Sequence, residues 1–295
     1  METPVRAGAA LSEAVARLAA VGVEEPRHDA ERLLARVLGV GRLALLTDPE
    51  RPLAAAGQAA FEAMIARRAA REPLQYILGD QPFRTLELCV TPATLIPRGE
   101  TEEVVERALR ALGDLRGRGI TRPQVLDLGA GSGCMALSIV AEWPTARVTG
   151  VDVCGEALAV ARQNAATAGV AGRVRLLEGD LYAPLQTGER FHLIVSNPPY
   201  LTPEEWQLAA PEVRDFEPRR ALLGGEDGLE FYRRIFAGAP RHLLPGGIVV
   251  VEIGWTQGQA VADIARRAGF RTVAVESDLG GRERMVVATG PDRED

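Results

Sequence analysis

The sequence predicts an α/β fold, in which a small N-terminal helical bundle precedes a mostly parallel, Rossmann-like sheet with an antiparallel C-terminal pair. After Pro123, short apolar runs alternate with amphipathic segments, which is typical of a parallel sheet covered by helices on both faces. Residues 1–73 show helical spacing only, and residues 74–92 show the period of two of a hairpin. We therefore expect a helical domain at 1–73, a β-hairpin linker at 74–92 and a larger α/β domain at 93–295.

The front domain is expected to contain three or four short helices. Apolar residues recur at helical spacing from Leu11 to Leu18, from Ala30 to Leu38 and from about Leu53 to Arg71. Gly22, Gly39 and Pro73 follow these segments as stop signals. A bundle of this size is too small to be an obvious catalytic unit, so we expect it to dock a partner.

The later elements follow in order. The hairpin pattern runs from Tyr76 through Gly79-Asp80 to Val90, and a helix is expected from Pro97 to Leu109. The expected strands and helices of the sheet are Val125–Leu128, Ala136–Glu142, Val148–Val151, Ala157–Ala168, Val174–Leu177, Leu193–Val195 and Ile248–Glu252. Thr272–Val275 and Met285–Ala288 flank Gly280-Gly281, which predicts the closing antiparallel pair.

Composition narrows the class of protein. The 295 residues are 46% hydrophobic and 25% charged, and the formal net charge of −6 argues against binding duplex nucleic acid mainly through its phosphates. No apolar run approaches the ~20 residues that span a bilayer, and the N-terminus lacks a signal-peptide core. The three cysteines and three histidines show no ligand or disulfide spacing. We expect a cytoplasmic monomer without metal, membrane or direct nucleic-acid contact.

A glycine-rich turn indicates a cofactor site. The first strand ends in Asp127-Leu128-Gly129-Ala130-Gly131-Ser132-Gly133 and leads directly into a helix. Glycines here allow the backbone to turn sharply and approach a ligand, with the helix N-terminus behind it. The G-x-G-x-G spacing differs from the G-x-G-x-x-G of dinucleotide folds, and a purely structural turn would look the same.

Acidic residues at the ends of later strands favour a nucleoside ligand. Asp152 closes the second strand, where a carboxylate can accept both ribose hydroxyls, and Asp180 follows the third, with Leu181 placed to pack on an adenine ring. The chain has no P-loop lysine, so S-adenosylmethionine fits better than a nucleoside triphosphate. Glu100 and Thr101, or Asp127, are candidates to face its amino-acid portion.

The chemical motif is Ser196-Asn197-Pro198-Pro199-Tyr200, which follows the fourth strand. Successive prolines fix the backbone and leave its carbonyls free. The side-chain carbonyl of Asn197 and the backbone carbonyl of Pro198 can then accept the two N–H bonds of a planar NH₂ group, on which Tyr200 can stack. Asn197 also borders the expected cofactor site. A rigid turn capping the strand is the structural alternative.

The motif resembles that of methyltransferases that act on planar nitrogens. Segments at 76–101, 211–228, 243–254 and 278–284 narrow the resemblance to the protein-(glutamine-N5) methyltransferases of bacterial class I release factors, within the class I S-adenosylmethionine-dependent methyltransferases. The resemblance covers nearly the whole chain. One departure is Gly99, where the family usually has proline. The resemblance implies transfer of a methyl group to the glutamine of the release factor's Gly-Gly-Gln motif, with Asn197, Pro198 and Tyr200 as catalytic residues.

Two other acceptors and one non-catalytic reading remain open at this point. A sister enzyme would methylate a glutamine of a ribosomal protein. An adenine or guanine amino methyltransferase would share the logic of the motif, although the acidic balance argues against it. A binding module that kept the fold without catalysis would have no need of the full motif.

Overall fold

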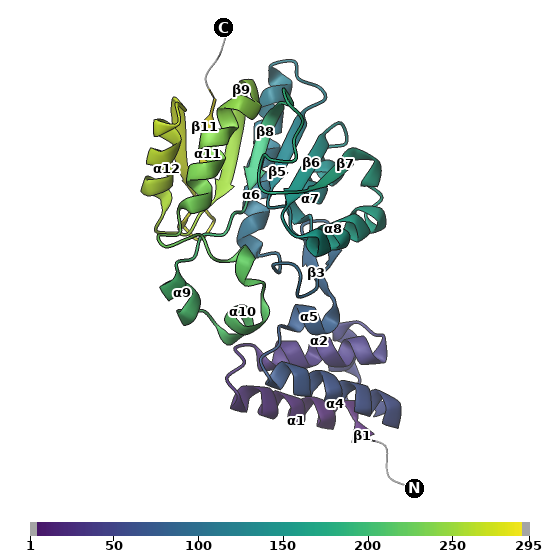
Figure 1. Cartoon of the computed structure of the whole chain (residues 1–295). Helices are drawn as coiled ribbons and strands as arrows, with labels where there is room; N and C mark the ends of the chain where they lie inside the picture. Colours follow the sequence, from purple (N-terminus) through teal and green to yellow (C-terminus); the bar gives the residue numbers. More distant parts are fainter. Residues whose placement is uncertain (1–4, 291–295) are drawn as a thin grey trace. The chain divides into compact units, whose positions relative to one another are not determined.

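The chain divides into two compact units in a computed structural model that describes residues 5–290. Of these residues, 5–79 together with 210–216 form a helical unit, and 80–209 together with 217–290 form an α/β unit (Figure 1). Within the described residues, no helix is both long enough and apolar enough to cross a membrane.

The helical unit is built around buried faces of its three longest helices. Leu18, Leu33, Leu34, Phe61 and Ile65 are completely buried in its core. Its elements are β1 (Val5–Arg6), α1 (Ala7–Ala20), α2 (Pro26–Leu38), α3 (Arg42–Thr47), β2 (Pro52–Leu53), α4 (Ala55–Ala69), α5 (Leu74–Leu78) and α10 (Pro211–Phe216). The three helical patterns of the sequence therefore correspond to α1, α2 and α4.

The first part of the expected hairpin is a helix instead. Leu74–Leu78 form α5, which starts after Pro73 and ends at Gly79, a residue in the left-handed conformation with φ of 81°. The hairpin itself consists of β3 (Asp80–Phe83) and β4 (Leu86–Cys89). A run of successive buried apolar residues fits either a short helix or a strand, so periodicity alone gave the wrong element for residues 74–78.

Helix α10 joins the helical unit through ion pairs. Glu212 on α10 accepts hydrogen bonds from Arg68 at 2.8 Å and from Arg71 at 2.7 and 2.8 Å. Arg68 also donates to Asp29 at 2.7 Å, and both of these residues are buried. Because Arg68 and Asp29 are both buried, removing either side chain would leave the charge of the other without a partner. A segment that follows the chemical motif in sequence is thus tied to the front helices.

The α/β unit contains one seven-stranded sheet and its helices. The strands are β5 (Gln124–Leu128), β6 (Arg147–Asp152), β7 (Val174–Glu178), β8 (Phe191–Ser196), β9 (Leu243–Glu252), β10 (Thr272–Ser277) and β11 (Glu283–Thr289). The helices are α6 (Gly99–Gly117), α7 (Cys134–Glu142), α8 (Gly155–Thr167), α9 (Pro203–Leu208), α11 (Glu230–His242) and α12 (Gly258–Arg267), with 3₁₀ turns η1 (Ala171–Arg173) and η2 (Arg219–Ala221).

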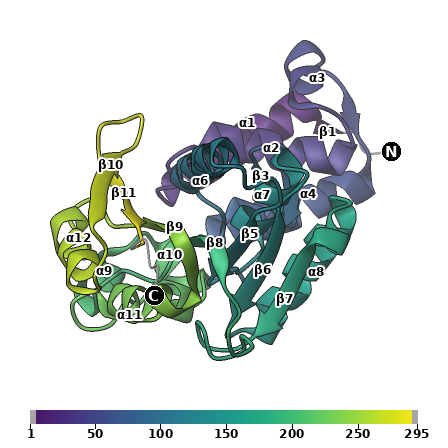
Figure 2. The same ribbon diagram turned by 90° about the horizontal axis from the view of Figure 1, so that it is seen from above.

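The sheet confirms the predicted fold class. Its strand order is β10-β11-β9-β8-β5-β6-β7. Strand β11 is antiparallel to both of its neighbours, and the neighbouring strands from β9 through β8, β5 and β6 to β7 are all parallel. Helices α6 and α7 pack on one face and α11 and α12 on the other, as the turned view shows (Figure 2). Because both faces are covered, the central strands are continuous apolar runs rather than alternating ones.

Candidate functional site

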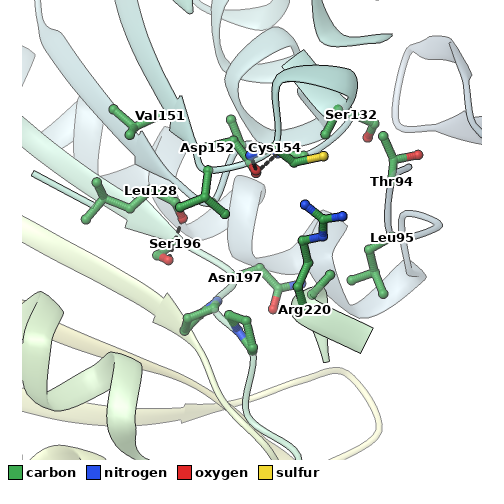
Figure 3. Close-up of a pocket in the computed structure, with 18 of the residues that line it drawn as sticks. Thr94, Leu95, Leu128, Ser132, Val151, Asp152, Cys154, Ser196, Asn197 and Arg220 are labelled. Atoms are coloured by element: carbon green, nitrogen blue, oxygen red, sulfur yellow. Dashed lines mark hydrogen bonds between the residues drawn. The ribbon is translucent and has the colours of Figure 1, made fainter. Parts of the chain in front are cut away.

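A pocket in the α/β unit lies at the carboxyl ends of the parallel strands. The strand order reverses between β5 and β8, and open α/β sheets bind ligands at such a point. Figure 3 shows Asp152, Asn197 and Arg220 around this hollow. The sequence-predicted residues that line it are Thr101, Gly129, Ala130, Gly131, Ser132, Asp152, Asp180, Leu181, Asn197, Pro198 and Pro199. Gly133, Asp127, Glu100 and Tyr200 are not among the lining residues.

The glycine turn and Asp152 support each other. Gly129, Gly131 and Gly133 have φ values of 79°, 53° and 84°, which residues with a Cβ rarely adopt. The carboxylate of Asp152 accepts hydrogen bonds from the backbone N–H groups of Gly131 and Cys154, each at 2.8 Å. Each carboxylate oxygen keeps further acceptor capacity toward the pocket.

Asp127 lies behind the turn and not on the pocket wall. It is fully buried, and its Oδ2 accepts from the backbone N–H of Ala136 at 3.1 Å. Among the described residues, its Oδ1 has no hydrogen-bond partner. Burial raises the pKa of this carboxyl group to about 7. Glu100, the other acidic candidate, is not among the lining residues, and its carboxylate lies 4.0 Å from the guanidinium of Arg284.

The third strand is followed by Asp180 and Leu181, both of which line the pocket. Asp180 forms an ion pair with Arg234 of α11. Leu181 has a φ of 49°, an unusual conformation for a leucine. Strained backbone of this kind persists where the surroundings hold it and is frequent beside ligands.

The Asn-Pro-Pro-Tyr turn is held from three sides. The hydroxyl of Ser196 donates to the carbonyl of Leu128 at 2.6 Å, and the N–H of Tyr200 donates to the carbonyl of Leu222 at 3.1 Å. The Nε2 of Gln257 donates to the carbonyl of Tyr200 at 3.0 Å. Burial raises the pKa of the Tyr200 phenol to about 12, so it stays neutral at physiological pH.

Sequence reasoning missed Glu252, the last residue of β9. The hydroxyl of Thr101 donates to Glu252 Oε2 at 2.7 Å, and the Nδ2 of Asn197 donates to the Thr101 hydroxyl at 3.2 Å. Burial raises the pKa of Glu252 to about 7, although the bond from Thr101 opposes the shift. A usable signal was present in the sequence, because Glu252, like Asp152, is an acidic residue at the end of an apolar strand.

The pocket offers polar and apolar groups that suit a nucleoside. The carboxylates of Asp152 and Asp180 line it together with the apolar side chains of Leu181 and Val153. Of the two lining arginines, Arg98 forms an ion pair with the buried Glu217. The carboxylate of Asp152 as a ribose acceptor and the apolar surface for a base fit S-adenosylmethionine.

Solved structures with this fold include methyltransferases. The chain is similar to a methyltransferase from Pyrococcus furiosus, with a TM-score of 0.50 and 20% identity over 78% of this chain and 98% of that chain. It is also similar to the catalytic domain of hMettl16, with a TM-score of 0.57 and 16% identity over 79% of this chain and 83% of that one. Residues 9–79 match the family described as PrmC N-terminal domain, and residues 111–212 match the Methyltransferase small domain.

The fold and the site therefore define an S-adenosylmethionine-dependent methyltransferase. A Geobacter sulfurreducens protein named release factor glutamine methyltransferase is 45% identical over 91% of this chain and 91% of its own length. A Cereibacter sphaeroides protein of the same name is 47% identical over 97% of this chain and 99% of its own length. The chain belongs to the release factor glutamine methyltransferase family, as the resemblance of its sequence implied.

Proposed function

We propose that this enzyme methylates the side-chain amide nitrogen of the glutamine in the Gly-Gly-Gln motif of class I release factors. Membership of the family supports the substrate, since the relatives carry that activity in their names. The observation that carries the chemistry is that Asn197, Pro198 and Pro199 line the same pocket as the glycine turn and Asp152. A carboxamide held by the motif would thus lie beside the methyl donor.

The roles of the residues follow from the acceptor's chemistry. A carboxamide nitrogen is a poor nucleophile because its lone pair is delocalised into the carbonyl. S-Adenosylmethionine, when bound, supplies an electrophilic methyl group. The side-chain carbonyl of Asn197 and the backbone carbonyl of Pro198 accept the two N–H bonds, which orients the nitrogen and stabilises positive charge as it develops. In the overall reaction a new N–CH₃ bond would replace the donor's S–CH₃ bond, the donor would leave as a neutral thioether, and the nitrogen would lose one proton to solvent.

Tyr200 and the helical unit complete the proposal. The half-buried Tyr200 follows the two prolines, and its neutral ring supplies a face for the planar amide. The helical unit docks the release factor, and the enzyme acts as a monomer in the cytoplasm.

The test of the substrate is transfer of a labelled methyl group to a purified class I release factor, followed by peptide mass mapping. We expect one added methyl group on the glutamine of Gly-Gly-Gln and none on a release factor in which that glutamine is alanine. Ribosomal proteins and adenine-containing nucleic acid serve as parallel acceptors. Label in either of these, with none in the release factor, would contradict the proposal.

The cofactor site yields a separate prediction. We expect Asp152→Ala to weaken S-adenosylmethionine binding by about 10- to 100-fold, because a hydrogen bond to a charged group contributes roughly 1.5–3 kcal/mol. Isothermal titration calorimetry measures this directly. Asp263→Ala, which removes an exposed carboxylate from α12, is the control and should bind normally. Unchanged affinity of the Asp152 variant would refute the ribose assignment.

A further inference from the structure

A buried chain of hydrogen bonds ends at the amide of Asn197. Its three members come from the first turn of α6, the end of β8 and the end of β9. Thr101 and Glu252 are 1% and 2% exposed, so water has little access to the bond between them. The hydroxyl of Thr101 lies 2.7 Å from Glu252 Oε2 and 3.2 Å from Asn197 Nδ2.

This chain of hydrogen bonds has a direction, which follows from which groups can donate and which can accept. The hydroxyl of Thr101 has one proton, and the structure places it in the hydrogen bond to Glu252 Oε2, which accepts. The oxygen of Thr101 can then only accept from its other neighbour. Asn197 must therefore present its NH₂ group to Thr101, and its carbonyl oxygen remains as the group offered elsewhere.

The direction of these hydrogen bonds decides which group of Asn197 faces the methyl-accepting substrate. Asn197 lines the pocket, and no bond to its Oδ1 is formed within residues 5–290. If the amide were rotated by 180°, it would present two N–H donors to a substrate group that itself carries N–H donors. The reacting nitrogen of a glutamine amide would then lose one of the two acceptors for its N–H bonds.

The charges around Glu252 bear on its ionisation. Arg284 and Arg98 favour the ionised form of Glu252, whereas Glu100 opposes it. The charge of Glu252 also raises the pKa of three neighbouring groups, the side chains of Tyr200, Tyr232 and Cys134. Arg284 is itself buried. Two cations near the carboxylate thus act against the effect of burial.

We propose that Thr101 and Glu252 are positioning residues, which fix the side-chain amide of Asn197 with its carbonyl oxygen toward the substrate. This inference rests on the proposed role of Asn197 and gives Thr101 a function other than cofactor binding. Glu252 acts only through Thr101, since it does not line the pocket.

The experiment compares Thr101→Val, which keeps the shape but removes the hydroxyl, with Thr101→Ser, which restores it. We expect the kcat of Thr101→Val to fall about 10- to 100-fold, because a misplaced group costs up to about 10² in rate. The cofactor's Kd should stay within about twofold, and the serine variant should recover most of the lost kcat. Glu252→Gln should also lower kcat at unchanged cofactor Kd, because an amide can offer its NH₂ group to Thr101 and reverse the chain.

The matched control is Thr149→Val on β6. The hydroxyl of Thr149 accepts a bond from Arg175 and takes no part in the site, so its kcat should match wild type. Melting temperatures of all variants separate loss of positioning from loss of folding. A Thr101→Val enzyme with wild-type kcat would overturn the proposal, as would weaker cofactor binding with normal turnover at saturating cofactor.

A readout without turnover separates this inference from the proposed substrate. In NMR spectra, the side-chain NH₂ signals of Asn197 are identified by their absence in Asn197→Ala. We expect one of these protons to exchange slowly with water in the wild type and fast in Thr101→Val. Equal exchange in both would refute the positioning role, whether or not release factor is the acceptor.

Discussion

Replacing Asn197 with alanine should lower kcat by about 10²–10³, the effect of removing one preorganised contact to charge that develops in the transition state. The side chain is expected to contribute to the reacting amide rather than to the cofactor, so the affinity for S-adenosylmethionine should change little. Steady-state kinetics with release factor and calorimetry with the cofactor measure the two quantities independently.

The outcome discriminates between the two interpretations of the motif. If the Asn-Pro-Pro-Tyr segment were only a rigid turn, Asn197→Ala would leave the prolines and the bonds from Ser196 and Tyr200 in place. Turnover would then remain near normal, which would contradict the mechanism. A large fall in kcat together with a normal melting temperature would support it.

The parts of the site that could be predicted from the sequence are local in the chain. The glycine turn and the Asn-Pro-Pro-Tyr motif each follow a strand directly, Asp152 is the last residue of another, and the carboxyl ends of parallel strands meet at one edge of a sheet. Short-range pattern therefore sufficed to expect these residues at one place. The parallel sheet itself was predicted for the same reason, since alternating strands and helices form it with few alternative topologies.

The features that sequence reasoning missed depend on contacts between distant residues. Thr101 and Glu252 are 151 positions apart, and Glu212 lies 141 positions from Arg71. Nothing in a single sequence pairs such residues, because any arginine and glutamate on the surface could pair equally well. Asp127 shows the converse, since its position beside the glycine turn was clear while its burial behind the turn was not.

Gly228 packs closely against the backbone of Tyr200, and a side chain added at Gly228 is expected to have the second large effect on turnover. Gly228 has a φ of 69°, and a Cβ at this position would overlap the backbone carbonyl oxygen of Tyr200 and lie 2.7 Å from Gln257 Nε2. These two atoms form the hydrogen bond that holds the end of the motif. We therefore expect Gly228→Ala to disturb the turn that carries Asn197 and Pro198.

We expect Gly228→Ala to lower kcat by about 10²-fold, since small displacements of positioning groups have effects of that size. Gly169→Ala is the matched control: Gly169 has nearly the same φ, 68°, but no atom lies within 4 Å of the added Cβ. Backbone strain should cost each variant about 1 kcal/mol of stability, and the overlap at Gly228 should add to the loss in that variant alone. Thermal unfolding measures both losses. Only the Gly228 variant should lose turnover. Equal kcat values in the two variants would mean that the carbonyl of Tyr200 can move without disturbing the reacting groups.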